Sequence, residues 1–360
     1  MSTTQSLDAG KQAAFEEKLV SMLNLGSLAV MVSIGHRTGL FDTMAGAGPL
    51  SSVEIADRAG LNERYVREWL GAVVTGQILE HDHATGTYWL PAEHAALVTR
   101  AATPNNLAVF AQYIPMMGTV EDDVIDCFKN GGGVPYSRYT RFHEVMAEDS
   151  GQTVLPVIES HILPLVDGLV DRLDQGIHVL DVGCGRGKAM NQLAKRFPNS
   201  TFVGVDLSAD AVAFATAEAE KAGLANVSFV QGDATHLADL IEPGSFQLVT
   251  TFDAVHDQAA PRKVVAAIRT ALTEDGVYLA QDIQGSSCHH GDMDHPIGPL
   301  LYSLSVTHCM TVSLAQGGDG LGTMWGREQA VALFNEAGFT DVAVNELDHD
   351  IQNYYYVCRP

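Results

Sequence analysis

Two kinds of hydrophobic pattern divide the chain. Apolar residues recur at helical spacing through most of the first 170 residues, whereas short β-branched runs separated by helical stretches begin at Ile177. The runs are 177–182, 201–206, 227–232, 246–251 and 276–283. Strands that alternate with helices predict an α/β fold, a doubly wound and mostly parallel Rossmann-like sheet with helices on both faces. Two last runs, 341–347 and 353–360, have no helix between them, so we expect an antiparallel hairpin at one sheet edge.

The first hundred residues show a helix, a turn, a second helix and a hairpin. Ser51 precedes a short helix that Gly60 ends, and Asn62 can cap a second helix. That second helix carries Tyr65, Val66, Trp69, Leu70 and Val73, which we expect on one face. Residues 78–80 and 87–90 flank a polar turn and predict a hairpin. This order is typical of a winged-helix domain, which makes the N-terminal part mainly helical.

The charge balance argues against anionic partners. The chain of 360 residues has 44 acidic against 21 basic side chains, a net charge of -23, while 46% of its residues are hydrophobic. Such a composition is that of a packed globular protein, and its acid surplus disfavours nucleic acid and anionic lipid as partners. The second helix of the winged segment has two arginines and two glutamates, so its charges cancel. We therefore expect the winged-helix domain to serve in dimerisation and in capping the substrate. We expect no nucleic acid or membrane partner.

The chain shows no recognisable targeting signal. No apolar run reaches the ~18 residues of a spanning helix, and the first residues have neither a basic nor an apolar signal region. Five scattered cysteines indicate reduced thiols better than a disulfide framework. We expect a cytoplasmic protein.

A glycine-rich loop follows the first strand of the sheet. Gly183, Gly185 and Gly187 come directly before a helix that begins near Lys188. Glycines here permit positive φ and allow the backbone to approach a ligand beside a helix N-terminus. The dinucleotide pattern GxGxxG would place its third glycine at position 188, which is lysine. An NAD-dependent dehydrogenase is therefore the more distant alternative.

The GxGxG loop and the acid before it, Asp181, resemble class I S-adenosylmethionine (SAM) methyltransferases. The resemblance implies SAM as cofactor and S-adenosylhomocysteine (SAH) as product. It places Asp206 and Leu207, after strand two, at the ribose, and Asp233 and Ala234, after strand three, at the adenine. Phe252, at the end of strand four, would lie over the cofactor.

A second motif precedes this domain. Phe142, Met146 and Ser150 are spaced by four, which places them along one helical face. They match the FxxxMxxxS pattern of winged-helix small-molecule O-methyltransferases. By this resemblance Phe142 and Met146 would pack on the sulfonium and adenosyl groups, and Ser150 would bind the methionine carboxylate. The whole chain resembles actinobacterial-type members of this family, with plant and polyketide enzymes more distant.

The resemblance also implies three parts and a homodimer. We expect a winged-helix and dimerisation domain over 1–104, a helical linker that lines the active site over 105–170, and a SAM-binding domain over 171–360. The acceptor would be a small molecule with a nucleophilic oxygen, nitrogen or sulfur atom. We expect Tyr113, Met117, Tyr302 and His308 to line its pocket.

His256 is the candidate general base. The relatives place a base in a His-Asp-Trp triplet after strand four, and this chain has His256, Asp257 and Gln258. A neutral imidazole, with an ordinary pKa of about 6.5, can accept a proton at physiological pH. The missing tryptophan weakens the expectation of a phenolic acceptor.

Two alternatives stay open at this point. Cys288, three histidines at 289, 290 and 295, and the pair His308 and Cys309 are soft ligands, but their spacing matches no standard zinc pattern, so we expect no metal. A SAM-responsive transcription regulator is the alternative function, with the winged helix on DNA and the cofactor as a ligand.

Overall fold

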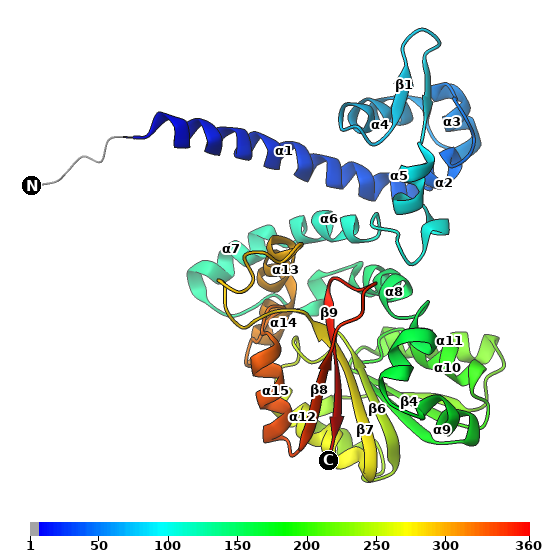
Figure 1. The fold of residues 1–360 in the computed structure, drawn as a ribbon, viewed down its shortest axis with the longest axis vertical. Coiled ribbons are helices and arrows are strands. Elements are labelled where there is room, and N and C mark those ends of the chain that lie inside the picture. Colours follow the sequence, from blue (N-terminus) through cyan, green and yellow to red (C-terminus); the bar gives the residue numbers. More distant parts are fainter. Residues whose placement is uncertain (1–6) are drawn as a thin grey trace, which may run out of the picture. The chain divides into compact units, whose positions relative to one another are not determined.

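The computed structural model describes residues 7–360. By its internal contacts the chain divides into two compact units, one that ends at Met116 and one that covers Met117–Pro360 (Figure 1). This division falls inside the predicted linker, 105–170, and assigns most of that segment to the second unit.

The first unit is helical with one small hairpin. Its elements are α1 (Ala9–Thr38), α2 (Leu40–Met44), α3 (Ser52–Ala59), α4 (Glu63–Thr75), β1 (Glu80–Asp82), β2 (Thr87–Trp89), α5 (Ala92–Val98), η1 (Arg100–Ala102) and η2 (Phe110–Gln112), with α6 (Tyr113–Gly118) at the boundary. Ser51 and Glu54 form a capping box at α3, and Asn62 caps α4 by accepting a hydrogen bond from the Arg64 amide. The predicted winged-helix order is confirmed.

The buried face of α4 differs from the prediction at one residue. Val66, Trp69, Leu70 and Val73 are buried in the core of this unit, whereas Tyr65 is 79% exposed. Spacings of three and four define the buried stripe from Val66 onward, and Tyr65 lies one position before it and faces solvent. Including Tyr65 in the apolar face was therefore wrong.

The hairpin begins two residues later than predicted. The amides of Ile78 and Leu79 donate to the Val73 carbonyl, which binds these residues to the end of α4. The strand β1 therefore starts at Glu80 and extends into the segment predicted as a turn, where the His81 ring stacks on Tyr88 with 4.5 Å between ring centroids.

Helix α1 meets the length and composition of a membrane span, which contradicts the expectation that no segment does. Its most apolar window of 18 residues has a mean hydropathy of 1.6. The serines and glycines within this window do not lower the mean enough to exclude a span. The C-terminal end of α1 packs on the winged core, where the Trp69 indole donates to the Met31 carbonyl at 2.9 Å. One such helix near an N-terminus is weak evidence for a membrane.

The second unit contains the predicted sheet. Its strands are β3 (His178–Val182), β4 (Thr201–Asp206), β5 (Val227–Gln231), β6 (Phe246–Phe252), β7 (Leu272–Ile283), β8 (Asp341–Asn345) and β9 (Asn353–Arg359), in the order β5-β4-β3-β6-β7-β9-β8. The pairs from β5 to β7 are parallel, whereas β9 is antiparallel to both β7 and β8. The mostly parallel sheet and the antiparallel edge hairpin are both as predicted.

Helices cover both faces of this sheet (Figure 1). The helices and helical turns are α7 (Glu121–Asn130), η3 (Tyr136–Arg138), α8 (Phe142–Thr153), η4 (Ile158–Ile162), η5 (Leu163–Leu165), α9 (Leu169–Gln175), α10 (Lys188–Arg196), α11 (Ala209–Lys221), η6 (Ala234–Asp239), α12 (Pro261–Ala271), α13 (Gly298–Leu304), η7 (Ser305–Cys309), α14 (Met310–Ala315) and α15 (Arg327–Glu336). Successive strand residues enter opposite cores: Val277 packs with α9 and α10, and Tyr278 packs with α12 and α15.

Candidate active site

A cavity of about 600 Å³ lies at the carboxyl ends of the central strands. Residues that follow β3, β4, β5 and β6 line it, together with one face of α8 and the segment 136–140. Every lining residue belongs to the second unit. The carboxyl edge of a doubly wound sheet is where such folds bind ligands, and the volume suits a small molecule.

The three glycines of the loop after β3 have positive φ for different reasons. A Cβ on Gly183 would lie 2.5 Å from the Ala254 Cβ, and one on Gly187 would lie 2.4 Å from the Phe229 ring. These two glycines are therefore required by packing. A Cβ on Gly185 would meet no protein atom within 4 Å, since Gly185 borders the cavity. The loop brings its backbone to the cavity beside the N-terminus of α10.

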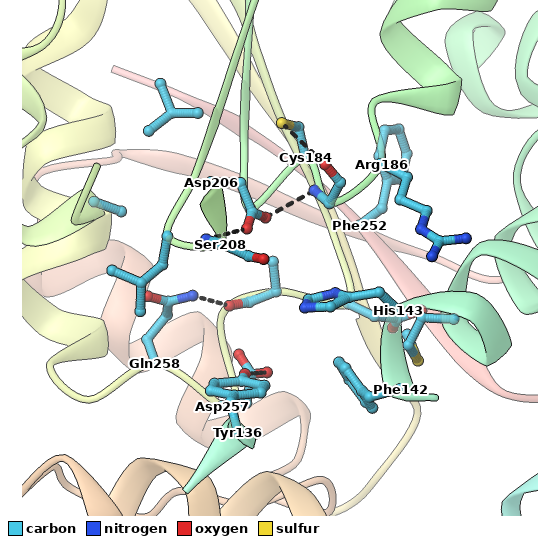
Figure 2. A pocket seen from close by; sticks show the side chains of 18 of the residues that line it. Tyr136, Phe142, His143, Cys184, Arg186, Asp206, Ser208, Phe252, Asp257 and Gln258 are labelled. Atoms are coloured by element: carbon cyan, nitrogen blue, oxygen red, sulfur yellow. Dashed lines mark hydrogen bonds between the residues drawn. The ribbon is translucent and has the colours of Figure 1, made fainter. Parts of the chain in front are cut away.

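Asp206, the last residue of β4, holds this loop in place (Figure 2). Its Oδ2 accepts from the Gly185 amide and its Oδ1 from the Ser208 amide, each at 2.8 Å. Each carboxylate oxygen can accept a second hydrogen bond. Asp206 thus links the ends of β3 and β4 and can still accept two hydroxyl donors from a ligand.

Two other predicted carboxylates have different surroundings. Asp181 is buried in β3, where it accepts from the Thr250 hydroxyl at 2.7 Å, and burial raises its pKa to about 7. Asp233 is half exposed and caps η6 by accepting from the Thr235 amide at 2.8 Å. Burial acts to raise the pKa of Asp233, but its hydrogen bonds with Thr235 and its interaction with His236 together lower the pKa by more.

Helix α8 presents the predicted face to the cavity. Phe142, Met146 and Ser150 all line it, as spacings of four require. The Lys188 ammonium at the start of α10 donates to the Ala147 carbonyl at 3.0 Å, which ties α8 to the glycine loop. The residue next to Phe142, His143, also faces the cavity, and burial lowers its pKa.

Most of the predicted cofactor residues therefore converge. The cavity is lined by Phe142, Met146, Ser150, Asp181, Gly183, Gly185, Asp206, Leu207, Asp233, Ala234 and Phe252. Gly187 supports the loop from behind, against Phe229 and Ala215. Their binding of a cofactor stays a prediction.

The candidate base His256 lies outside the lining of this cavity. The residue is 4% exposed, and its Nδ1 lies 2.8 Å from Oδ1 of Asp282 on β7. The same carboxylate oxygen accepts from the Trp325 indole at 3.0 Å and from the Ile283 amide at 2.8 Å. His256 is thus held by a buried carboxylate within the second unit.

The predicted acceptor-pocket residues do not line the cavity either. The ring of His308 stacks on Phe142 with 3.8 Å between centroids, and burial lowers its pKa to about 3, so the ring is neutral. Tyr302 donates to Asp292 at 2.7 Å, in a separate small cluster. Met117 begins the second unit, and Tyr113 belongs to the first. Their contact with an acceptor stays a prediction.

Several lining residues were missed by sequence reasoning. The important ones are Tyr136, His143, Asp253, Asp257 and Gln258. Asp253 has a positive φ of 52°, an uncommon conformation for a residue other than glycine. Asp257 directly follows His256 in the sequence, so the His-Asp pair could have indicated it. Tyr136 follows a glycine-rich loop, and no local pattern distinguishes it from other tyrosines.

Among residues 7–360, no group of three or more His, Cys, Asp or Glu side chains is placed to hold a metal ion. The Cys288 and His289 segment forms a turn in which Asp292 accepts from the Ser286 amide at 2.9 Å.

Family models match both units. Residues 26–100 match the Rv2258c-like winged HTH domain, and residues 173–326 match a methyltransferase domain. The chain joins a winged helix-turn-helix domain to a methyltransferase domain. The predicted combination is confirmed, and the cavity lies in the methyltransferase domain and in the helical segment directly before it.

Curated relatives match short stretches of the chain. A tRNA (guanine-N(7)-)-methyltransferase of Brevibacillus brevis is 42% identical over 64 residues, 18% of this chain and 29% of that protein. Nocamycin O-methyltransferase of Saccharothrix syringae is 40% identical over 90 residues, 24% of this chain and 31% of that protein. The chain thus spans about a third of the length of these relatives.

Solved structures match the fold over the full length. Human N-acetylserotonin methyltransferase, solved in complex with SAM, covers 100% of this chain and 99% of its own, with a TM-score of 0.67 and 16% identity. At this identity the likeness concerns the fold, which is the two-domain architecture of that enzyme.

Proposed function

We propose that the protein transfers a methyl group from SAM to a nucleophilic atom of a small molecule and releases SAH. The observation that carries this proposal is the convergence of the glycine loop, Asp206 and the α8 face on one cavity of the methyltransferase domain. These three features come from segments that are far apart in the sequence and surround one space at the carboxyl edge of the sheet.

The residues present suit the parts of SAM. Asp206 has lone pairs left for two ribose hydroxyls, because its two hydrogen bonds to the backbone use one on each oxygen. Phe142 and Met146 offer an aromatic and a polarizable surface that favour a sulfonium cation. Asp233 lies at the adenine end of the family's pattern, and Ser150 can hydrogen-bond the methionine carboxylate. When bound, SAM supplies an electrophilic methyl group.

Two measurements test the proposal. Calorimetric titration with SAH should show binding at one site per chain. Release of SAH from SAM should depend on adding a member of a panel of small hydroxyl, amine and thiol compounds. SAH binding without release for any member would reduce the proposal to a cofactor-binding protein, and no SAH binding would contradict it.

A general base belongs to this proposal when the acceptor is a weak nucleophile. The sequence predicts His256, and turnover of His256→Ala checks that role. A small loss at saturating acceptor would exclude His256 as an essential base.

We also propose a cytoplasmic homodimer formed through the winged domain. Phe15, Leu19, Met22 and Leu23 are exposed along α1 at spacings of three and four, which form an apolar stripe. A second copy of the chain can cover this stripe. A membrane could cover it too, so flotation with lipid vesicles is the control for a dimer measured by light scattering.

A DNA-binding regulator is the alternative function, which the winged HTH match brings forward. The charges on α4 do not favour it. Arg64 pairs with Glu68 and Arg67 pairs with Glu63 within the helix, so neither arginine is left without a counter-charge toward phosphates. A gel shift at low salt, with and without SAM, checks this alternative; a specific, SAM-dependent complex would support it.

A further inference from the structure

One end of the cavity is formed by a tyrosine and a carboxylate. The Tyr136 hydroxyl donates to Asp257 Oδ2 at 2.5 Å, and both residues line the cavity. Figure 2 shows this pair and Phe142 at the opposite end from Asp206 and Cys184. This inference rests on the proposed function, in which Asp206 and the glycine loop bind the cofactor at one end of the cavity. The other end, with Tyr136 and Asp257, is therefore left for the methyl acceptor.

His256 is directed away from this end. Its Nδ1 is bonded to Asp282, whose Oδ1 also accepts from Trp325 and Ile283, and the ring does not border the cavity. A base must reach the proton that it removes, either directly or through one water. The neighbouring residue in the chain, Asp257, does reach the cavity.

The charge state of His256 also favours Asp257 as the group that accepts the proton. Burial acts to lower the pKa of His256, but the Asp282 carboxylate and the Cys309 thiol raise it by more, so it lies well above 6.5. An imidazolium has no lone pair with which to accept a proton. It acts instead as a buried cation beside Asp257.

Opposing influences act on the pKa of Asp257. Burial raises the pKa of this carboxyl, and Asp282 and Asp206 add to that, whereas the His256 charge and the Tyr136 hydrogen bond lower it. The net rise leaves a stronger base than an exposed aspartate.

Asp253, the other carboxyl at this side, has different surroundings. Burial and Asp282 raise its pKa much further, with Asp149 and Asp350 adding and only the His256 charge opposing. Its Oδ2 accepts from Gln281 at 3.3 Å, while its Oδ1 has no hydrogen-bond partner. The pKa of Asp253 is therefore raised further than that of Asp257, as in other sites that separate two carboxyl groups by environment.

We propose that Asp257, aligned by Tyr136, accepts the proton of the methyl acceptor, and that this acceptor is a neutral hydroxyl compound. The acceptor O–H donates to the Asp257 carboxylate. As the bond between the acceptor oxygen and the methyl carbon forms, the bond from that carbon to sulfur breaks and its electron pair stays on sulfur. The proton moves to Asp257 and leaves to water after the products, the methyl ether and SAH, have departed.

The charges that line the cavity select this class of acceptor. The two fixed cations among the lining residues, Arg186 and Lys188, belong to the glycine loop and the start of α10. Arg186 lies over the Phe214 ring at 4.6 Å, and Lys188 is bonded to Ala147. A carboxylate at the acceptor end would meet the Asp257 carboxylate, and no lining residue at that end supplies a cation to offset their repulsion. A hydroxyl group of the acceptor can instead donate a hydrogen bond to the Asp257 carboxylate.

The experiment uses matched acceptors and four variants of the full chain. Hydroxyl compounds such as catechol and 2-naphthol are paired with benzoate and 2-naphthoate, and SAH release is measured at saturating SAM from pH 5.5 to 9.5. We expect transfer to hydroxyl members only. Asp257→Asn should lower kcat by about 100-fold or more with unchanged SAH affinity. Asp275→Asn, which removes an exposed carboxylate on β7, is the control and should match wild type.

The pH profile separates a base from a structural residue. Tyr136→Phe and His256→Gln each remove an influence that lowers the pKa of Asp257, so the acidic limb of the profile should move to higher pH, with activity restored at pH 9. Loss of activity in His256→Gln at every pH, with at least a tenth of kcat left in Asp257→Asn, would assign the base to His256 and overturn this inference.

The remaining outcomes are also decisive. Transfer to the carboxylates, or to no member of either set, would overturn the acceptor class. SAH titration of the same preparations tells whether the cofactor site stands, so failure of this inference is distinguishable from failure of the proposed function.

Discussion

The hydroxyl of Tyr136 lies 2.5 Å from Oδ2 of Asp257, although 121 residues separate the two in the chain. One comes from the loop before α8 and the other from the segment after β6, and together they form one wall of the cavity. Contacts between aromatic rings hold this wall. The His308 ring stacks on Phe142 and lies edge-on to Tyr136 and Tyr139. The position of Tyr136 thus depends on the packing of η7 against the loop before α8.

Replacing Asp206 by alanine should weaken SAH binding. The change removes the ribose acceptor and leaves the amides of Gly185 and Ser208 without their partner at the cavity edge. The loss of such charged hydrogen bonds costs about 1.5–3 kcal/mol, so calorimetry should show SAH affinity reduced by about 10- to 100-fold. Asp210→Ala, a lining carboxylate at the start of α11, is the control. Equal affinity of Asp206→Ala and wild type would contradict the ribose assignment.

Replacing Gly187 by alanine should destabilise the methyltransferase domain. The new Cβ would lie 2.4 Å from the Phe229 ring and 2.6 Å from the Ala215 Cβ, at a φ of 64°. Overpacking of this kind costs about 1–3 kcal/mol, so the Tm should fall by at least about 2 °C. Gly223→Ala, with a similar φ of 67° and open space around it, measures the backbone strain alone. A similar Tm for the two variants would show that contact with Phe229 is unimportant.

Asp181→Asn should stabilise the protein above neutral pH. The pKa of Asp181 is raised by burial to about 7 in the folded state, against about 3.9 in an unfolded chain. Between these values the unfolded chain releases a proton that the folded protein keeps, so the stability falls as the pH rises and the full cost is present above pH 7. Asparagine can still accept from Thr250.

The measurement is the free energy of unfolding by urea at pH 5 and pH 8. Relative to wild type, the gain of Asp181→Asn should be roughly 2–3 kcal/mol larger at pH 8 than at pH 5. Asp275→Asn, which neutralises an exposed carboxylate, is the matched control. A gain that does not grow with pH would mean that Asp181 is ionised in the fold at no cost.

Charges on the α1 stripe should disrupt the proposed dimer. Leu19→Glu with Leu23→Glu places two like charges where a second copy would pack, while Ser21→Glu adds a charge on the opposite side of the same helix. We expect light scattering to show a dimer for wild type and Ser21→Glu and a monomer for the double variant. A monomeric wild type that floats with lipid vesicles would favour the membrane instead.

Elements with a local cause were predicted closely: the capped helices of the winged domain, the strands of the sheet and the α8 face depend on side-chain periods and on caps within a few residues. The errors also have local physical reasons. Ile78 and Leu79 bind the end of α4, and Tyr65 lies one residue before the buried stripe.

The two-domain order, the GxGxG loop and the carboxylates that follow successive strands could be predicted from local patterns, because parallel strands place their carboxyl ends at one edge whatever the loops do. Which side chains face the cavity depends on contacts between distant segments of the chain. His256 and Asp257 are adjacent in the chain, yet one is bonded to Asp282 in the interior and the other meets Tyr136 at the cavity. That difference depends on β7 and on the loop before α8, two segments that no local pattern connects.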